Sequence, residues 1–107
     1  MKTVTSRKEL IAGIKAGERH FNVKGKSLLL QCSIASKFNS VGNVTDAAVA
    51  SVVPAAGANV AITGPVLLGL TAIAIVGAIA IIAILKDKHL KIKVKNANGD
   101  VGEIEVF

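Results

Sequence analysis

Cysteine and histidine are the residue types in this chain best suited to nucleophilic or metal chemistry, and they are few. The sequence contains one cysteine, Cys32, and two histidines, His20 and His89. A Cys32–His20 pair could generate a reactive thiolate if their segments adjoined, but no third group is spaced to orient the histidine. Cys32 lies in the apolar stretch LLLQCSIA, which favours a buried and unreactive thiol. We therefore expect no disulfide and no catalytic cysteine.

Motifs for other ligands are equally scarce. No cluster of Cys, His and acidic residues has metal-ligand spacing. The stretch GANVAITG has the glycines of a phosphate loop but lacks its lysine and a preceding strand pattern. The net charge of +6 would suit nucleic acid, yet the chain has three Phe and no Tyr or Trp to stack on bases. The sequence predicts a protein that is not an enzyme, has no metal or other cofactor, and has no nucleic-acid partner.

Charged residues are absent from the middle of the chain, between Asp46 and Lys86. Ion-coupled transport usually needs ionisable groups at membrane depth, so a coupled pump is not expected. Polar side chains are also rare there, and Asn59 is the most informative of them. It could hydrogen-bond across a pair of helices or line a pore, and we favour the first role.

The apolar middle ends in the run GPVLLGLTAIAIVGAIAIIAIL, residues 64–85. A helix over residues 66–85 would span about 30 Å, which is the thickness of the hydrocarbon core of a bilayer. Gly64 and Pro65 favour a break before it, and Lys86 and Lys88 could reach the lipid headgroups after it. Two alternatives stay open: a soluble assembly that buries the run between subunits, and a β-segment, since AIAIVGAIAI alternates with period two.

The preceding segment, residues 45–63, predicts a second apolar helix, capped by Thr45 or Asp46 and interrupted by Pro54. Small residues recur along one face of each helix, which lets helix backbones approach closely in lipid. We expect a tight antiparallel hairpin. The residues predicted to pack the helices or to join copies of the protein are Ala47, Ser51, Ala55, Asn59, Gly69, Ala72, Ala80 and Ala83.

The N-terminal flank begins with capping-box chemistry, since Ser6 is followed three residues later by Glu9. The pattern predicts a helix over about residues 7–16, stopped by Gly17. From Glu18 the hydrophobic period changes to two, which predicts a strand and then a turn at residues 25–26. Residues 27–34 are mostly apolar and show no clear period. Such a run can be a buried strand or a short helix, and we favour the strand.

The C-terminal flank predicts a β-hairpin, because Leu90, Ile92 and Val94 alternate with lysines and Ile104 and Val106 alternate with glutamates. A three-residue turn at residues 98–100 would set Val94 opposite Ile104 and Ile92 opposite Val106. In this register Lys93 faces Glu105, and Lys95 faces Glu103.

The predicted fold class is α+β with a membrane-inserted helical hairpin: a short N-terminal helix, a small antiparallel sheet built from both flanks, and two apolar helices. Residues 1–44 would form the cytoplasmic helix and strands, residues 45–86 the membrane hairpin, and residues 87–107 a β-hairpin packed on the N-terminal part. Residues 1–46 contain eight Lys/Arg and three Asp/Glu, and residues 86–107 contain five and four. Because positive residues favour the cytoplasmic side, the expected location is the inner cell membrane with both termini cytoplasmic.

The function expected from this plan is that of a small self-associating membrane protein that forms pores or perturbs the bilayer, with the lipid bilayer and further copies of itself as partners. The plan resembles that of small holin-type and pore-forming effectors, in architecture and without a shared motif. One alternative is an anchored scaffold or immunity-type protein whose tails hold a protein partner at the membrane. The other is a soluble or filamentous homo-oligomer that buries the apolar helices.

Overall fold

A computed structural model describes residues 1–38, 44–96 and 100–107 and contains four helices and four strands in this part of the chain. The strands are β1 (Lys2–Val4), β2 (His20–Lys24), β3 (Leu90–Val94) and β4 (Val101–Val106). The helices are α1 (Arg7–Lys15), α2 (Lys26–Ala35), α3 (Asp46–Asn59) and α4 (Gly64–Leu85). The protein is therefore of the α+β class, as predicted.

The strands form one mixed sheet in the order β1-β2-β4-β3. β2 pairs antiparallel with β4, so strands from the two flanks of the sequence lie side by side at the centre of the sheet. β1 pairs parallel with β2, which corrects the predicted purely antiparallel sheet. A strand of three residues is too short to show a recognisable period in the sequence.

The β3–β4 hairpin forms, but two residues away from the predicted register. Ile92 lies opposite Ile104, and Leu90 lies opposite Val106. The connection is longer than expected because the Lys95 N–H donates to the Val101 carbonyl, which leaves residues 96–100 between the strands. The shift by two keeps every apolar side chain on its predicted face, since side chains alternate with period two. Of the predicted turn, residues 98 and 99 lie outside the described residues.

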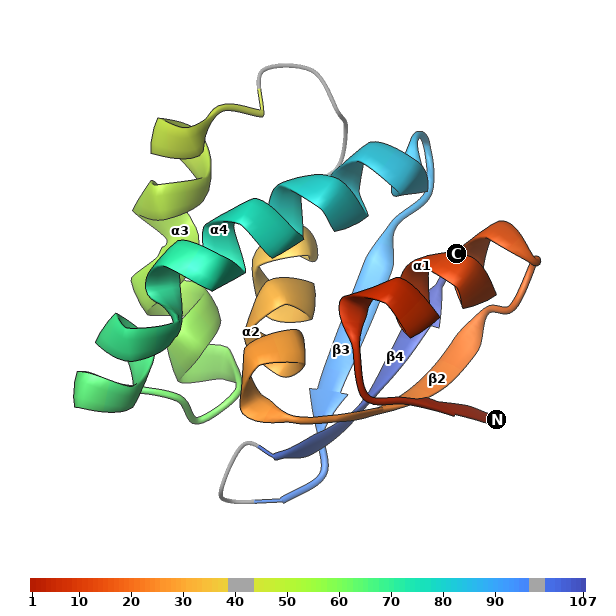
Figure 1. Ribbon diagram of the computed structural model, residues 1–107, viewed down its shortest axis with the longest axis horizontal. Coiled ribbons are helices and arrows are strands. Elements are labelled where there is room, and N and C mark those ends of the chain that lie inside the picture. The colour runs from red at the N-terminus through yellow and green to blue at the C-terminus, as the bar shows by residue number, and fades with distance from the viewer. Residues whose placement is uncertain (39–43, 97–99) are drawn as a thin grey trace.

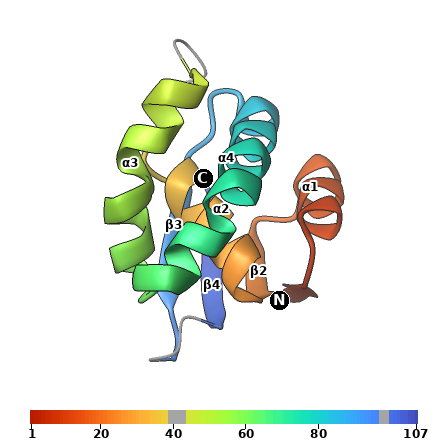
Figure 2. The same cartoon turned by 60° about the vertical axis from the view of Figure 1, so that its left-hand side comes forward.

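Helices cover one face of the sheet and leave the other face open (Figure 1). α2 is the central helix: it contacts β2, β3 and β4 on one side and α3 and α4 on the other. Figure 2 shows α3 and α1 on opposite sides of the molecule, with α4 between them. The core contains side chains from α2, from α4 and from the inner face of the sheet, including Leu29, Ile81, Phe21 and Ile104.

Residues 27–34, predicted to be a strand, belong instead to helix α2. Every residue from Leu28 to Ala35 is buried, including the polar Gln31 and Ser33. A helix buried on all sides has no polar stripe, so its sequence carries no helical period. The predicted turn before it is present, because Gly25 has a φ of +113° between β2 and α2.

The predicted helix ends are largely confirmed. The Ser6 hydroxyl accepts a hydrogen bond from the Glu9 N–H at 3.2 Å, as in a capping box. The Glu9 carboxylate reaches back to the N–H of Thr5 rather than to that of Ser6. The Thr45 hydroxyl caps α3 by accepting from the Ala48 N–H at 3.1 Å. Pro54 does not interrupt α3, which is continuous from Asp46 to Asn59.

Candidate membrane-binding surface

One side of α4 presents large apolar side chains to solvent. Leu68 is 79% exposed, Val76 64%, Ile73 59% and Val66 47%. A buried core helix would account for the apolar sequence of α4 only if its side chains were covered. In the most apolar 18-residue window of α4, 28% of the residues are buried. The protein fold alone therefore does not explain why α4 is apolar on all sides.

Several of the exposed positions follow a regular spacing along α4, while Leu68 lies beside them. Alternate steps of three and four residues connect positions that lie along one side of a helix. We call this row the outer face of α4; it consists of Val66, Gly69, Ile73, Val76, Ala80 and Ala83, of which Ala80 is partly buried and the others are exposed. The row contains no charged or polar side chain over the full length of the helix.

Burial is unevenly distributed along α4. Of its six buried residues, Ala74 is the only one before position 77, and the others follow at Gly77, Ala78, Ile81, Ile82 and Leu85. The C-terminal part of α4 packs into the core cluster that contains the sheet and α1, whereas its N-terminal part extends along α3 (Figure 1). The N-terminal part of α4 is therefore less buried than its C-terminal part.

The predicted small-residue face of α3 also lies on the surface: Ala47, Ser51, Ala55 and Asn59 are all exposed. On α4, Gly69, Ala72 and Ala83 are exposed and Ala80 is partly buried. α3 and α4 do lie side by side, but their buried contact uses other residues, among them Val49, Val53 and Ala56 with Ala74 and Ala78. The prediction that the small faces pack these two helices together is wrong, because both helices turn their buried faces toward Leu30 and Ile34 of α2. Contacts between copies of the protein through these residues stay a prediction.

A buried amide lies at the contact between α2 and α4. Gln31 is 5% exposed, and its Nε2 donates to the Ser27 hydroxyl at 3.1 Å. Its Oε1 is buried and has no hydrogen-bond partner among the described residues. Gly77 lies directly against this amide, and a Cβ at that position would overlap it. The α2–α4 contact therefore includes an unsatisfied polar atom, which costs stability compared with an apolar contact.

Lys86 and Lys88 are exposed directly after α4, which agrees with their predicted position but leaves their role at a membrane interface a prediction. Lys86 ends the helix with a φ of +54°, in the left-handed region that favours glycine. These lysines border a groove of about 330 Å³ between the C-terminal ends of α1 and α4.

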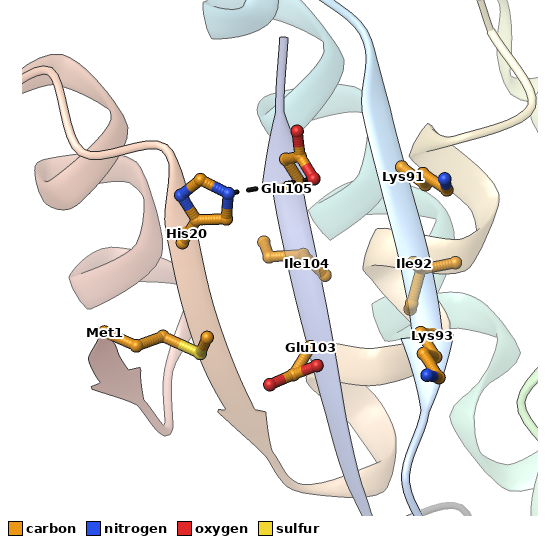
Figure 3. A pocket seen from close by; sticks show the side chains of 8 residues that line it. All are labelled: Met1, His20, Lys91, Ile92, Lys93, Glu103, Ile104 and Glu105. Carbon is orange, nitrogen blue, oxygen red and sulfur yellow. Dashed lines mark ion pairs between the residues drawn. The ribbon is translucent and has the colours of Figure 1, made fainter.

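The open face of the sheet is charged rather than apolar. Figure 3 shows His20, Lys91, Lys93, Glu103 and Glu105 around a shallow groove of about 190 Å³. His20 Nε2 lies 3.7 Å from Glu105, and Lys95 Nζ lies 2.8 Å from Glu103. The hydrogen bond from Lys95 lowers the pKa of the Glu103 carboxyl below its ordinary value. The predicted Lys95–Glu103 contact is present, whereas Lys93 lies opposite Glu103 and not Glu105.

Cys32 and His20 do not come together. Cys32 is fully buried in α2, and this burial raises the pKa of its thiol to about 12. His20 lies on the exposed face of β2, on the side opposite to the buried Phe21. Within residues 1–38, 44–96 and 100–107, no group of His, Cys, Asp and Glu side chains is arranged to hold a metal ion.

No protein-family model matches the chain, and no characterised protein or solved structure is significantly similar to it. Among the described residues, one helix, α4, is long and apolar enough to cross a membrane. α3 has 14 residues and would span about 21 Å, which is less than the hydrocarbon core. The exposed surface of α3 and α4 is therefore the main feature from which a function can be inferred.

Proposed function

We propose that the protein is a small membrane-inserting protein that buries α3 and the N-terminal part of α4 in a lipid bilayer, associates with copies of itself there, and perturbs or perforates the bilayer. The observation that carries this proposal is the exposed outer face of α4, with Ile73 and Val76 more than half exposed. Full burial of one such side chain is worth about 1.5–3 kcal/mol, so a bilayer or a second protein surface is a favourable environment for this face.

The sheet supports entry of the two helices from one side of the membrane. β2 precedes α3 and α4 in the sequence, β4 follows them, and the two strands are hydrogen-bonded neighbours. As long as the sheet stays folded, both flanks must lie on the same side of the bilayer. α3 and α4 would then enter the bilayer and return to the side from which they came. The basic flanks favour the cytoplasmic side of the inner membrane.

The length of α3 supports partial insertion rather than two complete crossings. Its span of about 21 Å sets how deeply the hairpin can enter while both helices keep their present bounds. The less covered N-terminal part of α4 runs beside it, and the C-terminal part of α4 can stay packed against α2 and α1. Insertion to this depth would separate α3 from Leu30 and Ile34 of α2, but it would leave the core cluster around the sheet folded.

Self-association is supported by the outer face of α4. Its regular spacing would allow α4 helices of neighbouring copies to pack along their length, and Gly69, Ala80 and Ala83 would let their backbones approach closely. A ring of such hairpins could open a path through the bilayer, whereas separate hairpins would only distort it.

The test is dye release from lipid vesicles by the purified protein. We expect release by the parent protein and loss of release in Leu68→Lys/Val76→Lys, because two charges on the exposed part of α4 oppose insertion. Phe107→Lys is the matched control, since Phe107 is 56% exposed but lies at the end of the sheet sequence, outside α3 and α4. Circular dichroism should show that all three proteins are folded. Equal release by the double variant and the parent, or no vesicle binding by the parent, would contradict the proposal.

The soluble homo-oligomer is the second candidate, because α4 already has one buried face and α3 is too short to span a membrane. It would bury the outer face of α4 against a second copy. This candidate predicts a defined oligomer in detergent-free buffer, dissociated by Leu68→Lys/Val76→Lys, and no binding to vesicles. Sizing the parent protein with and without mild detergent separates the two candidates.

A further inference from the structure

We propose that the groove between the C-terminal ends of α1 and α4 binds the phosphate headgroup of an anionic phospholipid. This inference rests on the proposed insertion in a bilayer, and it names the class of lipid that the protein selects. The groove has a volume of about 330 Å³. Its lining consists of Ile14 and Lys15 from α1 and of residues 83–88 from the end of α4.

Three lysines from two distant parts of the sequence line this groove. Lys15 is in the last turn of α1, and Lys86 and Lys88 follow α4. The Lys88 N–H donates to the Leu85 carbonyl at 2.8 Å, which holds the chain in a tight turn at the end of the helix. Asp87 is the one carboxylate in the lining, so the groove has a formal charge of +2. This charge suits one phosphate group.

The groove also has an apolar side, which favours a lipid over a free anion. Ile14, Ala83 and Leu85 belong to its lining. Ala83 is the last residue of the outer face of α4, and we propose that the N-terminal part of this face is in contact with acyl chains, so the groove lies at the headgroup end of the same face. A phosphate held by the lysines would place the attached chains along α4.

The backbone at Lys86 supports a role for its side chain. Its φ of +54° lies where a residue with a Cβ is strained, and glycine is the usual residue at this position after a helix. This chain has a lysine there and not a glycine. Strain of this kind concentrates at functional positions.

Another role for these lysines follows from helix electrostatics. The carbonyl ends of α1 and α4 are both at the groove, and basic side chains stabilise such ends. That role predicts an effect of the lysines on folding stability and none on the choice of lipid. The two roles therefore lead to different outcomes in a binding experiment.

The experiment measures co-flotation of the full chain with vesicles of phosphatidylcholine alone and of phosphatidylcholine mixed with phosphatidylglycerol. Lys86→Gly removes one charge and relieves the backbone, so we expect it to be folded at least as stably as the parent. Its affinity for the anionic vesicles should fall about fivefold, which corresponds to one lysine near a charged membrane surface. Lys15→Gln should give a similar loss.

A control variant isolates the groove. Lys91→Gln removes one charge from the open face of the sheet, outside the groove. It should bind anionic vesicles as the parent does. Excess inorganic phosphate should not displace the protein if the acyl chains contribute to binding.

The proposal is overturned if the parent binds neutral and anionic vesicles equally, a result that would leave the proposed insertion intact. It is also overturned if Lys91→Gln weakens binding as much as Lys86→Gly, because general electrostatic attraction would then explain the lipid preference. Displacement by inorganic phosphate would identify a free-anion site in place of a lipid site. Absence of binding to either vesicle by the parent would contradict the proposed function itself.

Discussion

α2 and α4 are both apolar helices, yet they differ in how much of each helix is buried. Eight of the ten residues of α2 are buried, although its sequence includes Gln31 and Ser33. Six of the 22 residues of α4 are buried, although none of its residues is charged. The core is thus built around the less apolar helix. α4 is therefore more apolar than folding requires, which points to an environment outside the single chain.

The largest difference between the two helices should appear in thiol reactivity. In Leu68→Cys, the new thiol on α4 is expected to react with a soluble thiol reagent at once, since position 68 is 79% exposed. Cys32 on α2 should react at least about 1,000-fold more slowly, because it is reached only when the protein opens. Its raised pKa of about 12 further reduces the reactive thiolate. Absorbance stopped-flow should resolve two phases, and a single fast phase would show that α2 is not the stable core.

The same truncation on each helix should separate them in stability. Leu29→Ala removes a fully buried side chain from α2 and should lower the free energy of unfolding by about 2–5 kcal/mol. Leu68→Ala on α4 should change it by less than about 0.5 kcal/mol. Urea denaturation in detergent-free buffer measures both. A large loss in Leu68→Ala would mean that a second copy covers this part of α4 in solution.

Two glycines allow a comparison within α4 itself. Gly77→Ala places a methyl group against the buried Gln31 amide and should cost about 1–3 kcal/mol. Gly69→Ala meets no atom within 4 Å and should stabilise the helix by up to about 1 kcal/mol. Thermal denaturation of both variants measures the contrast. Equal effects would mean that the buried and outer faces of α4 do not differ in solution.

The smallest expected effect concerns the unsatisfied amide between the two helices. Gln31→Met keeps the volume and removes the buried Oε1 that has no partner among the described residues. It should raise the free energy of unfolding by about 1 kcal/mol, because a buried oxygen without a hydrogen-bond partner is removed, and urea denaturation measures this gain. Gln31→Glu is the opposing control, because a buried carboxyl at this position should lower stability. If Gln31→Met is instead less stable than the parent, the Gln31 Oε1 accepts a hydrogen bond from water in the folded protein.

Local sequence signals predicted the elements that have one exposed side. The Ser6 and Thr45 caps, the alternation around Phe21 and the β3–β4 hairpin all depend on short-range contrast between polar and apolar residues. α2 has no such contrast, because it is buried on all sides, and it was predicted as a strand. The hairpin register depended on the length of its connection, and sequence alternation fixes only which face a side chain occupies.

Sequence patterns cannot identify the exposed surface of α4, for a related reason. A helix that is apolar on every side presents no preferred face in its sequence, so the row from Val66 to Ala83 can be identified only once α2 and α3 are in place. The groove with Lys15 depends in the same way on tertiary structure, since Lys15 and Lys86 come from opposite parts of the sequence. The end of α4 at Leu85 was predicted without such information, whereas its start lies at Gly64, two residues before the predicted one, because proline is tolerated in the first turn of a helix.

The order of the strands in the sheet has a consequence for synthesis. β4 lies between β2 and β3, and its partner β2 is made about 85 residues earlier, as the paired positions His20 and Glu105 show. Contacts between such distant segments form late, after local helices. On the ribosome, α3 and α4 are therefore complete before the sheet can close. Until β4 pairs with β2, the C-terminal part of α4 lacks the part of its core that the sheet supplies, so closure of the sheet by β4 completes the burial of this end of the helix.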